Sequence, residues 1–375
     1  MGSAASDYRS AVTLKRTPLY DRHVAAGAKT ADFGGWEMPI EYTGVMAEHA
    51  GVRQAVGVFD VSHMGKVRIH GPGAVAFLNG ILTNDLDRIG AGQAQYTMLC
   101  NDQGGVIDDL IVYRWADDEV FLVPNAANAA SVIEVLRASA PAGVTIEDHH
   151  DDHGIIAVQG PRSRDLIESM GLPADHDYMT MVASEFRGQQ IIVCRTGYTG
   201  EHGYELVAPS AVLVDLWDAL LARREEFGLV RAGLGARDTL RTEMGYPLHG
   251  QDISLDISPV EAGLTWAIGW DKPAFAGREA LTAEKAAGPR RRLRGLLSAD
   301  RAIPRSHMRV MRGGLDGEVI GEVTSGTFSP TMKQGIALAL LDPSVDLDTE
   351  VVVDVRGRAG TFRVVRLPFV QPSTR

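Results

Sequence analysis

The character of the chain changes near residue 290, and this change restricts the folds that the chain can adopt. Beyond it, short apolar runs are separated by glycine or proline turns, as in small all-β domains. The runs are 293–297, 308–311, 318–324, 336–341, 351–355 and 361–365. The last two flank a glycine-containing loop at 356–360, which is typical of a hairpin. We therefore expect a C-terminal β domain, a small barrel or jelly-roll-like unit, over 285–375.

The preceding part of the chain mixes strand and helix patterns without regular alternation, which favours an α+β fold over a doubly wound one. Strand patterns lie at 66–70, 106–113, 120–124, 155–159 and 190–195, and helix patterns follow Gly44 and Gly73 and cover 128–138 and 210–223. Ser210 is the expected N-cap of the last helix. A length of 375 residues predicts two or three domains. The polar, alanine-rich stretch 271–288 is the expected junction before the β domain.

Composition excludes several classes of function. The net charge of −11 argues against a general nucleic-acid binder. No apolar run reaches the length of a membrane span, so we expect no membrane association. The only cysteines, Cys100 and Cys194, are far apart, which indicates a reducing, cytoplasmic setting rather than a disulfide framework. Residues 1–13 read as a tail, and the loose match of residues 1–6 to a myristoylation pattern is too unspecific to change that interpretation.

The sharpest chemical signal is one predicted strand that carries two acids. A turn at 101–105, with two glycines, leads into the β-branched run 106–113, which contains Asp108 and Asp109. Carboxylates in an apolar strand are costly to bury without a partner or a task. Strand alternation should send them to opposite faces, so at least one points into a closed space. Burial would raise its pKa toward neutrality, although a carboxylate that only caps backbone amides is the alternative.

Three further segments are dense in residues that suit a ligand site. Residues 196–205 combine three glycines, two tyrosines and two acids directly after a strand. Arg237 opens a predicted helix, where Asp238 and Arg241 have the spacing of an ion pair that would leave Arg237 free. Residues 247–253 form a polar loop. Each segment taken alone is equally compatible with a well-satisfied turn.

Metal and nucleotide motifs receive little support. The cluster of histidines and aspartates at 149–153 lies between predicted elements, without a helical register to fix ligands, so we expect a solvated loop and no metal site. The glycine pairs at 71–73 and 233–235 lack the third glycine of a dinucleotide fingerprint. No phosphate-binding loop and no nucleophile elbow occurs. Nicotinamide and nucleoside triphosphate chemistry therefore have no sequence support.

The motifs together resemble the aminomethyltransferase, or T-protein, family of the glycine cleavage system. The resemblance runs from Lys15 almost to the C-terminus. The segments that carry it are 15–20, 32–39, 59–65, 83–85, 104–113, 195–205, 233–238, 250–252 and 324–326. This many motifs in one order make the similarity specific.

The resemblance implies a three-domain, T-protein-like architecture around a central folate cavity. A first, discontinuous α+β domain would cover 14–65 and 150–275, a second α+β domain 66–149, and the β domain 285–375. The implied reaction takes an aminomethyl group from the lipoyl arm of the H-protein. Tetrahydrofolate accepts the one-carbon unit as the 5,10-methylene form, and ammonia and the reduced lipoyl arm are released.

The family pattern also implies roles for individual residues. Asp109 is the catalytic carboxylate, which stabilises positive charge on the carbon–nitrogen unit and accepts a proton from folate. Its neighbours Ile107 and Ile111 would provide an apolar setting, whereas Asp108 is interpreted as structural. Glu205 would accept the adjacent N–H groups of the pterin, and Arg237 would contact the pterin or a folate carboxylate. Further folate-lining candidates are Tyr96, Asn125, Tyr198, Met64 and, with a core position as an equal alternative, Trp266.

Two other functions fit a fold of this kind. One is a folate-dependent demethylase domain, found fused to flavin-dependent amine oxidases, but no flavin-binding region is recognisable here. The other is a non-catalytic folate-binding accessory protein. Such proteins usually carry a glycine-cysteine-tyrosine motif where this chain has Gly250, Gln251 and Asp252. The missing cysteine and the retained Asp109 favour the enzyme.

Overall fold

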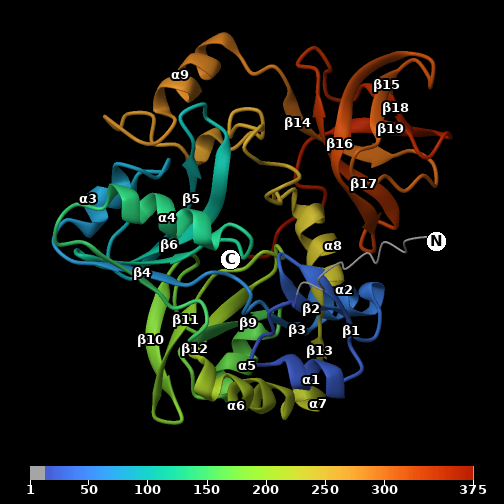
Figure 1. Ribbon diagram of the computed structural model, residues 1–375. Coiled ribbons are helices and arrows are strands. Elements are labelled where there is room, and N and C mark those ends of the chain that lie inside the picture. Colours follow the sequence, from blue (N-terminus) through green and yellow to red (C-terminus); the bar gives the residue numbers. More distant parts are fainter. Residues whose placement is uncertain (1–12, 375) are drawn as a thin grey trace, which may run out of the picture.

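The computed structural model describes residues 13–374, and Figure 1 shows three β-rich units stacked around a common centre. The expected tail lies almost entirely outside the described residues, as does the myristoylation-like segment. None of the helices in the described part has the length and apolarity needed to cross a lipid bilayer.

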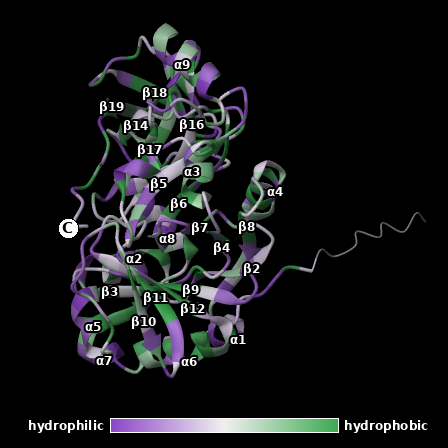
Figure 2. Cartoon of the chain, turned by 90° about the vertical axis from the view of Figure 1, so that its left-hand side faces the viewer, coloured by the Kyte–Doolittle hydropathy of each residue, from purple (hydrophilic) through white to green (hydrophobic). Residues whose placement is uncertain are grey.

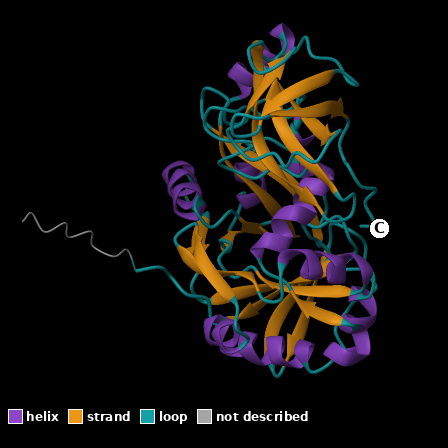
Figure 3. Cartoon of the chain, turned by 90° about the vertical axis from the view of Figure 1, so that its right-hand side faces the viewer, coloured by secondary structure: helices purple, strands orange, loops and turns teal. Residues whose placement is uncertain are grey.

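The lower unit is a six-stranded sheet that is discontinuous in sequence (Figure 1). Its strands, in spatial order, are β10 (Met181–Phe186), β11 (Gln189–Cys194), β12 (Gly203–Pro209), β9 (His153–Gln159), β3 (Val56–Asp60) and β13 (Leu229–Arg231). Only the β13–β3 pair is parallel. One face packs its apolar residues against Trp217 and Leu216 of α6 (Ser210–Leu221). Figure 3 shows helices lining the underside of this sheet; these include α1 (Tyr20–Ala25), α5 (Ser163–Ser169) and α7 (Arg224–Phe227).

A second sheet is inserted between β3 and β9 in the sequence. It is antiparallel, with the order β5 (Gln93–Cys100), β6 (Val106–Ala116), β7 (Glu119–Val123), β4 (Val67–His70) and β8 (Thr145–Asp148). The helices α3 (Ala74–Asn79) and α4 (Ala129–Ser139) and the short η1 (Leu86–Arg88) accompany it. Val132 and Leu136 of α4 are fully buried against Val112 and Leu122 of the sheet. The strand with the two acids, β6, is an interior strand, between β5 and β7.

The C-terminal unit is a closed six-stranded barrel, which confirms the expected β barrel. Its strands, in chain order, are β14 (Arg292–Ser298), β15 (Arg309–Arg312), β16 (Glu318–Ser329), β17 (Gln334–Leu341), β18 (Glu350–Asp354) and β19 (Ala359–Val365). Each corresponds to one of the six predicted runs. Alternate apolar residues point inward, among them Val323, Val353 and Phe362, and form a separate core. Figure 2 shows the barrel at the end of the molecule opposite the six-stranded sheet.

The helix α8 (Leu234–Met244) connects the units. It packs against α2 (Val45–Gln54) and the hairpin strand β2 (Trp36–Glu41), whose partner is β1 (Lys29–Phe33), and on its other side against β16 and β17 of the barrel. After the barrel, the chain returns to the centre, where Ser373 N donates to Gly200 O at 2.6 Å. Helix α8 and the chain end thus hold residues from different units around one central region (Figure 1).

Two predicted features differ in detail from the structure. Ser210 was expected to be the N-cap of α6, and this is wrong: Pro209 occupies the cap position and the Ser210 hydroxyl donates to Asp151 O instead. The expected junction 271–288 contains α9 (Arg278–Ala287), whose Leu281 is fully buried against Cys100 and Phe275. The short η2 (Thr265–Ala267) precedes it. The boundaries given above for the three domains stay a prediction.

Candidate active site

Asp109 is positioned by the antiparallel register of β5 and β6. In this register Met98 lies opposite Asp109 and Tyr96 opposite Ile111. Tyr96 and Asp109 are therefore diagonal neighbours on one face of the sheet. The Tyr96 hydroxyl donates to Asp109 Oδ2 at 3.0 Å, and the Asn125 side-chain amide donates to Asp109 Oδ1 at 2.8 Å.

Asp108 is fully buried and has more hydrogen-bond donors than its neighbour. Its carboxylate accepts from the Asn125 backbone N–H and side-chain amide, both at 2.9 Å, and from the Asn128 amide at 2.7 Å. Strand alternation was expected to separate Asp108 and Asp109 to opposite faces. Both carboxylates nevertheless accept from the single side-chain amide of Asn125, which follows the end of β7 at Val123.

Burial is the largest influence on the pKa values of Asp108 and Asp109. It raises the pKa of Asp109, while hydrogen bonds from Tyr96 and Asn125 act in the opposite direction. Burial, together with the negative charge of Asp109, raises the pKa of Asp108 to about 8. Among residues 13–374, neither carboxylate forms a salt bridge with a lysine or arginine. The raised pKa that the sequence predicted for a buried strand carboxylate is therefore present at both positions.

An aromatic wall begins at Tyr96. Its ring stacks on Trp266, with centroids 5.4 Å apart and an interplanar angle of 28°. Trp266 is 62% exposed, so the alternative of a core tryptophan is wrong. Tyr198 stacks on Tyr246 in the same way at 5.6 Å, and its hydroxyl donates to the Pro247 carbonyl. Burial raises the pKa of Tyr198, and the negative charge of Asp109 acts in the same direction.

Arg237 lies in the first turn of α8, with its guanidinium carbon 4.7 Å from the centre of the Tyr198 ring. Its Nη1 is buried and has no hydrogen-bond partner among the described residues. The predicted Asp238–Arg241 pair is confirmed, at 2.7 Å, and Arg241 also binds Asp252 at 2.8 Å. Arg237 is thus left with unused donor capacity, and a buried unpaired donor of this kind suits a ligand acceptor.

Glu205 lies on β12 and is held by a short chain of hydroxyl groups. Thr196 Oγ1 donates to Glu205 Oε2 at 2.6 Å, and the Tyr113 hydroxyl lies 2.9 Å from Thr196 Oγ1. Burial lowers the pKa of Arg237 and the charge of Glu205 raises it, so Glu205 and Arg237 act on each other electrostatically. Glu205 Oε1 has no hydrogen bond in the described chain and can accept one from a ligand.

Met64 is partly buried and packs against the apolar cluster that contains Phe59, Tyr113 and Cys194. It follows His63, whose Nδ1 is buried without a partner within residues 13–374. Burial lowers the pKa of His63 to about 3, with the charge of Arg237 among the contributing causes. Met64 thus packs against the same cluster as Tyr113, whose hydroxyl contacts the Thr196 that donates to Glu205.

Two groups of predicted residues emerge from these contacts. Asp109, Tyr96, Asn125 and Trp266 form one chain of contacts, and Tyr198, Arg237 and Glu205 form another. Two surface grooves lie elsewhere: one of about 740 Å³ is lined by Arg195 and His176, and the other by Cys100 and Ile107.

Asn128 and His249 also belong to this arrangement, although the sequence did not predict them. The His249 ring accepts at Nδ1 from the Asn128 amide, at 3.0 Å, and donates from Nε2 to Val106 O, at 2.9 Å; the tautomer follows from these partners. Two asparagines three residues apart, directly after a strand, were the available signal for Asn128. His249 lies in the polar loop 247–253, but nothing in the sequence connects it to β6.

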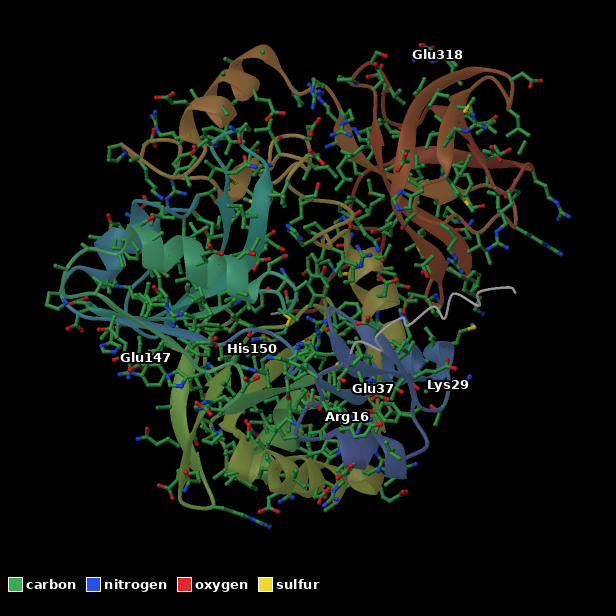
Figure 4. The ribbon with its side chains drawn as sticks, viewed as in Figure 1. Arg16, Lys29, Glu37, Glu147, His150 and Glu318 are labelled. Carbon is green, nitrogen blue, oxygen red and sulfur yellow. The ribbon has the colours of Figure 1, made fainter. Side chains whose placement is uncertain are left out.

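The histidine cluster forms the turn between β8 and β9. His150 stacks on Trp36 at 5.2 Å and His149 Nε2 lies 3.4 Å from Glu147. Figure 4 shows His150 and Glu147 where the two sheets approach each other in that view. No group of three or more metal-ligating side chains is found among the residues that the structure describes.

Comparison with known proteins identifies the family. The model of the GCVT N-terminal domain matches residues 19–272, and that of the glycine cleavage T-protein C-terminal barrel domain matches 291–371. The aminomethyltransferase of Parafrankia sp. (strain EAN1pec) is 62% identical over 96% of this chain and 99% of its own length. That of Mycobacterium avium (strain 104) is 57% identical over 96% of this chain and 98% of its own length.

A solved structure agrees with these matches. The glycine cleavage system aminomethyltransferase T from Bartonella henselae superposes with a TM-score of 0.90 at 35% identity, covering 96% of this chain and 99% of that one. Both domain models and both full-length relatives are thus consistent with the sequence resemblance. The chain belongs to the family of glycine cleavage T-proteins, the aminomethyltransferases.

Proposed function

We propose that the protein transfers a one-carbon unit from the lipoyl arm of the H-protein to tetrahydrofolate. The donor carries an aminomethyl thioether, and the products are 5,10-methylenetetrahydrofolate, ammonia and the reduced lipoyl arm. The aminomethyltransferases that resemble this chain over nearly its whole length support the proposal. The two cysteines are free and buried, which is compatible with the reducing, cytoplasmic setting that we retain as part of it.

The observation that carries the proposal is the environment of Asp109. Its carboxyl group is hydrogen-bonded only by neutral donors within the described chain, and one of them, Tyr96, is stacked on the exposed Trp266. A carboxylate without a protein counter-ion can stabilise positive charge that develops on the aminomethyl carbon and nitrogen. In a site that excludes water this interaction is stronger than it is in solvent.

The second group of residues suits the pterin and the rest of folate. Glu205 has an oxygen available to accept from adjacent N–H groups, and Arg237 has a buried donor without a partner. Tyr198 and Tyr96 offer flat faces for ring stacking. We assign Glu205 to the amino edge of the pterin, Arg237 to a folate oxygen, and Met64, Asn125 and Trp266 to the walls of a central folate cavity.

The proposal is tested by product analysis with purified components. The enzyme is mixed with aminomethylated H-protein and tetrahydrofolate, and ammonia and 5,10-methylenetetrahydrofolate are measured. We expect equimolar release of both, and neither when the aminomethylated donor is omitted. The absence of both products in the complete mixture, with the donor and folate verified, would refute the proposed reaction.

The alternatives are not favoured. A non-catalytic folate-binding accessory protein would bind tetrahydrofolate but would release no ammonia in this assay. A demethylase would produce methylenetetrahydrofolate from an N-methyl amine in the presence of an oxidising flavoprotein, independently of a lipoyl carrier. The two product measurements, with and without the H-protein, distinguish all three.

A further inference from the structure

Gln159, the last residue of β9, is a fully buried amide that lies outside the groups assigned to the aminomethyl donor and to folate. Its Nε2 donates to Thr196 O and to Tyr204 O, both at 3.1 Å, and its Oε1 accepts from Thr199 Oγ1 at 2.8 Å. Both amide hydrogens are therefore used. The orientation of the amide follows from these partners, because its oxygen could not donate to two carbonyl groups.

The segment 196–203 packs closely around this amide. Gly203 lies opposite Gln159 in the register of β9 and β12. A Cβ at Gly203 would lie 2.4 Å from Gln159 Cδ, and one at Gly197 would lie 2.1 Å from Gln159 Oε1. A side chain at either position would displace the amide, so the absence of a Cβ is what allows the close approach. Two of the three glycines in this segment therefore serve the contact with Gln159.

Gln159 acts on both sides of Glu205. Thr196, whose carbonyl accepts from Gln159, uses its own hydroxyl to donate to Glu205 Oε2 at 2.6 Å. Tyr204, the second carbonyl acceptor, directly precedes Glu205 in β12. The amide thus ties the hydroxyl that orients the Glu205 carboxylate to the strand that carries it.

Tyr198 is restrained by the same amide. Gly197 before it packs on the amide, and Thr199 after it donates to Oε1. The Tyr198 ring lies 4.7 Å from the guanidinium carbon of Arg237. Gln159 therefore holds the chain on both sides of a residue that faces Arg237.

Other contacts hold the middle of the segment. Arg53 Nη1 donates to Thr199 O at 2.7 Å, and Ser373 N donates to Gly200 O at 2.6 Å. Gln159 instead joins the two ends of the segment, at Thr196 and Tyr204. A change at Gln159 should therefore leave the segment attached to the protein and loosen chiefly the residues next to Glu205 and Tyr198.

We propose that Gln159 is a positioning residue that preorganises the folate site. The inference rests on the proposed function, in which Glu205 accepts from the pterin and Tyr198 offers a face for stacking. Gln159 is fully buried and both its donors are occupied, so it acts through these two residues rather than on the substrate. Residues that are already ordered lower the entropic cost of binding, so Gln159 should determine affinity for tetrahydrofolate more than the rate of the bound state.

Gln159→Glu in the full-length enzyme tests this role. Glutamate has the same length and still accepts from Thr199, but a carboxylate cannot donate to two carbonyl groups. The dissociation constant of tetrahydrofolate, measured by equilibrium titration, should rise about tenfold or more, since two hydrogen bonds are lost. The KM for aminomethylated H-protein and the single-turnover rate at saturating folate should change less than about threefold.

Gly197→Ala tests the same contact from the side of the loop, because the new methyl group displaces the amide without altering Gln159. We expect a loss of folate affinity in the same direction. The double variant Gln159→Glu, Glu205→Ala should lose less affinity than the product of the two single losses, because Gln159 acts partly through Glu205. A role confined to the stability of the fold would give the full product.

Gln190→Glu is the matched control, because it makes the same chemical change at an exposed glutamine on β11 of the same sheet. It should leave the affinity, the KM and the rate unchanged. The inference is overturned if folded Gln159→Glu and Gly197→Ala variants bind tetrahydrofolate as tightly as the control, if affinity and rate fall by equal factors, or if the losses multiply in the double variant. Product formation by the wild type tests the proposed function separately, since the tetrahydrofolate titrations need no lipoyl donor.

Discussion

Tyr96 and Asp109 lie on neighbouring strands, two residues out of direct register, and a hydrogen bond of 3.0 Å joins them across the same face of the sheet. The contact depends on the pleat rather than on sequence proximity. The exposed Trp266 stacks on the Tyr96 ring and so links this contact to the surface.

Tyr96→Phe should reduce turnover and shift its pH dependence upward. The Tyr96 hydrogen bond lowers the pKa of Asp109, so its removal raises that pKa further and delays ionisation. The limb of kcat/KM that reports this ionisation should therefore move to higher pH. Loss of one hydrogen bond to a charged group should cost about tenfold to a hundredfold in kcat. A downward or absent shift would contradict this role of Tyr96.

Asp109→Asn should abolish most of the chemistry while preserving the fold and folate binding. Removal of a single preorganised electrostatic contact typically costs about 10²–10³ in rate. The change is measured as single-turnover formation of methylenetetrahydrofolate, with folate affinity determined by equilibrium titration. Asp102→Asn, at an exposed acid in the turn that leads into the same strand, is the control. Full turnover in Asp109→Asn would disprove the central assignment.

Glu205→Ala should weaken tetrahydrofolate binding more than it slows the reaction of bound substrate. The side chain is expected to contact the pterin edge, away from the reacting carbon, and loss of a charged hydrogen-bond partner costs about 1.5–3 kcal/mol. Dissociation constants and single-turnover rates measured at saturating folate separate the two effects. Glu185→Ala, an exposed acid on β10 of the same sheet, is the matched control. Equal losses in affinity and rate would reject this division of roles.

Local patterns predicted much of the fold and part of the site. The six runs of the barrel were recognisable because glycine and proline turns separate them, and the Asp238–Arg241 pair followed from helical spacing. The prediction that Ser210 is the N-cap of α6 was wrong. Pro209 occupies the cap position, and the Ser210 hydroxyl donates to the backbone carbonyl of Asp151 instead. Capping propensity alone does not account for a tertiary hydrogen bond that competes for the same hydroxyl.

Contacts between segments that are distant in sequence could not be predicted from local sequence patterns. His249 and Val106 are 143 positions apart, and only the packing of the loop after α8 against β6 brings them together. Alternation predicted carboxylates on opposite faces, but it did not reveal that one Asn125 amide donates to both of them. The roles of Asp109, Glu205 and Arg237 came from family resemblance and stay predictions, although their burial and partners fit them.

The packing of α8 against the barrel should be destabilised strongly by Asp252→Ala and only slightly by Asp238→Ala. Asp252 is fully buried and binds Arg241 at 2.8 Å, Thr324 Oγ1 at 2.5 Å and Ser325 Oγ at 2.8 Å. Asp252→Ala would leave the buried Arg241 poorly compensated, at a cost of about 3–5 kcal/mol in unfolding free energy. Asp238 is half exposed, so Asp238→Ala should cost at most about 1 kcal/mol. Denaturant unfolding of the two variants compares them directly, and similar losses would refute the distinction.

Lys66→Met should stabilise the protein at neutral pH and lose that advantage in alkali. Lys66 is fully buried, its ammonium group donates to Ser62 O at 2.8 Å, and burial lowers its pKa to about 8. The unfolded chain keeps the proton up to the ordinary value near 10.5, so between these values the unfolded state binds more protons and wild-type stability rises with pH. Below pH 8 the folded protein bears the full penalty of the buried charge, about 3 kcal/mol.

Methionine of similar length removes this penalty but leaves Ser62 O without its donor, which costs about 1–2 kcal/mol. The net gain at pH 7 should therefore be about 1–2 kcal/mol, and it should vanish or reverse sign as pH approaches 10.5, where wild-type Lys66 is neutral in the folded state. Urea unfolding at pH 7 and pH 10 measures both values. Lys15→Met, at a side chain that is 57% exposed, is the control and should show no comparable gain. Destabilisation of Lys66→Met at pH 7, or a gain that grows with pH, would show that the ammonium group is stabilised where it lies.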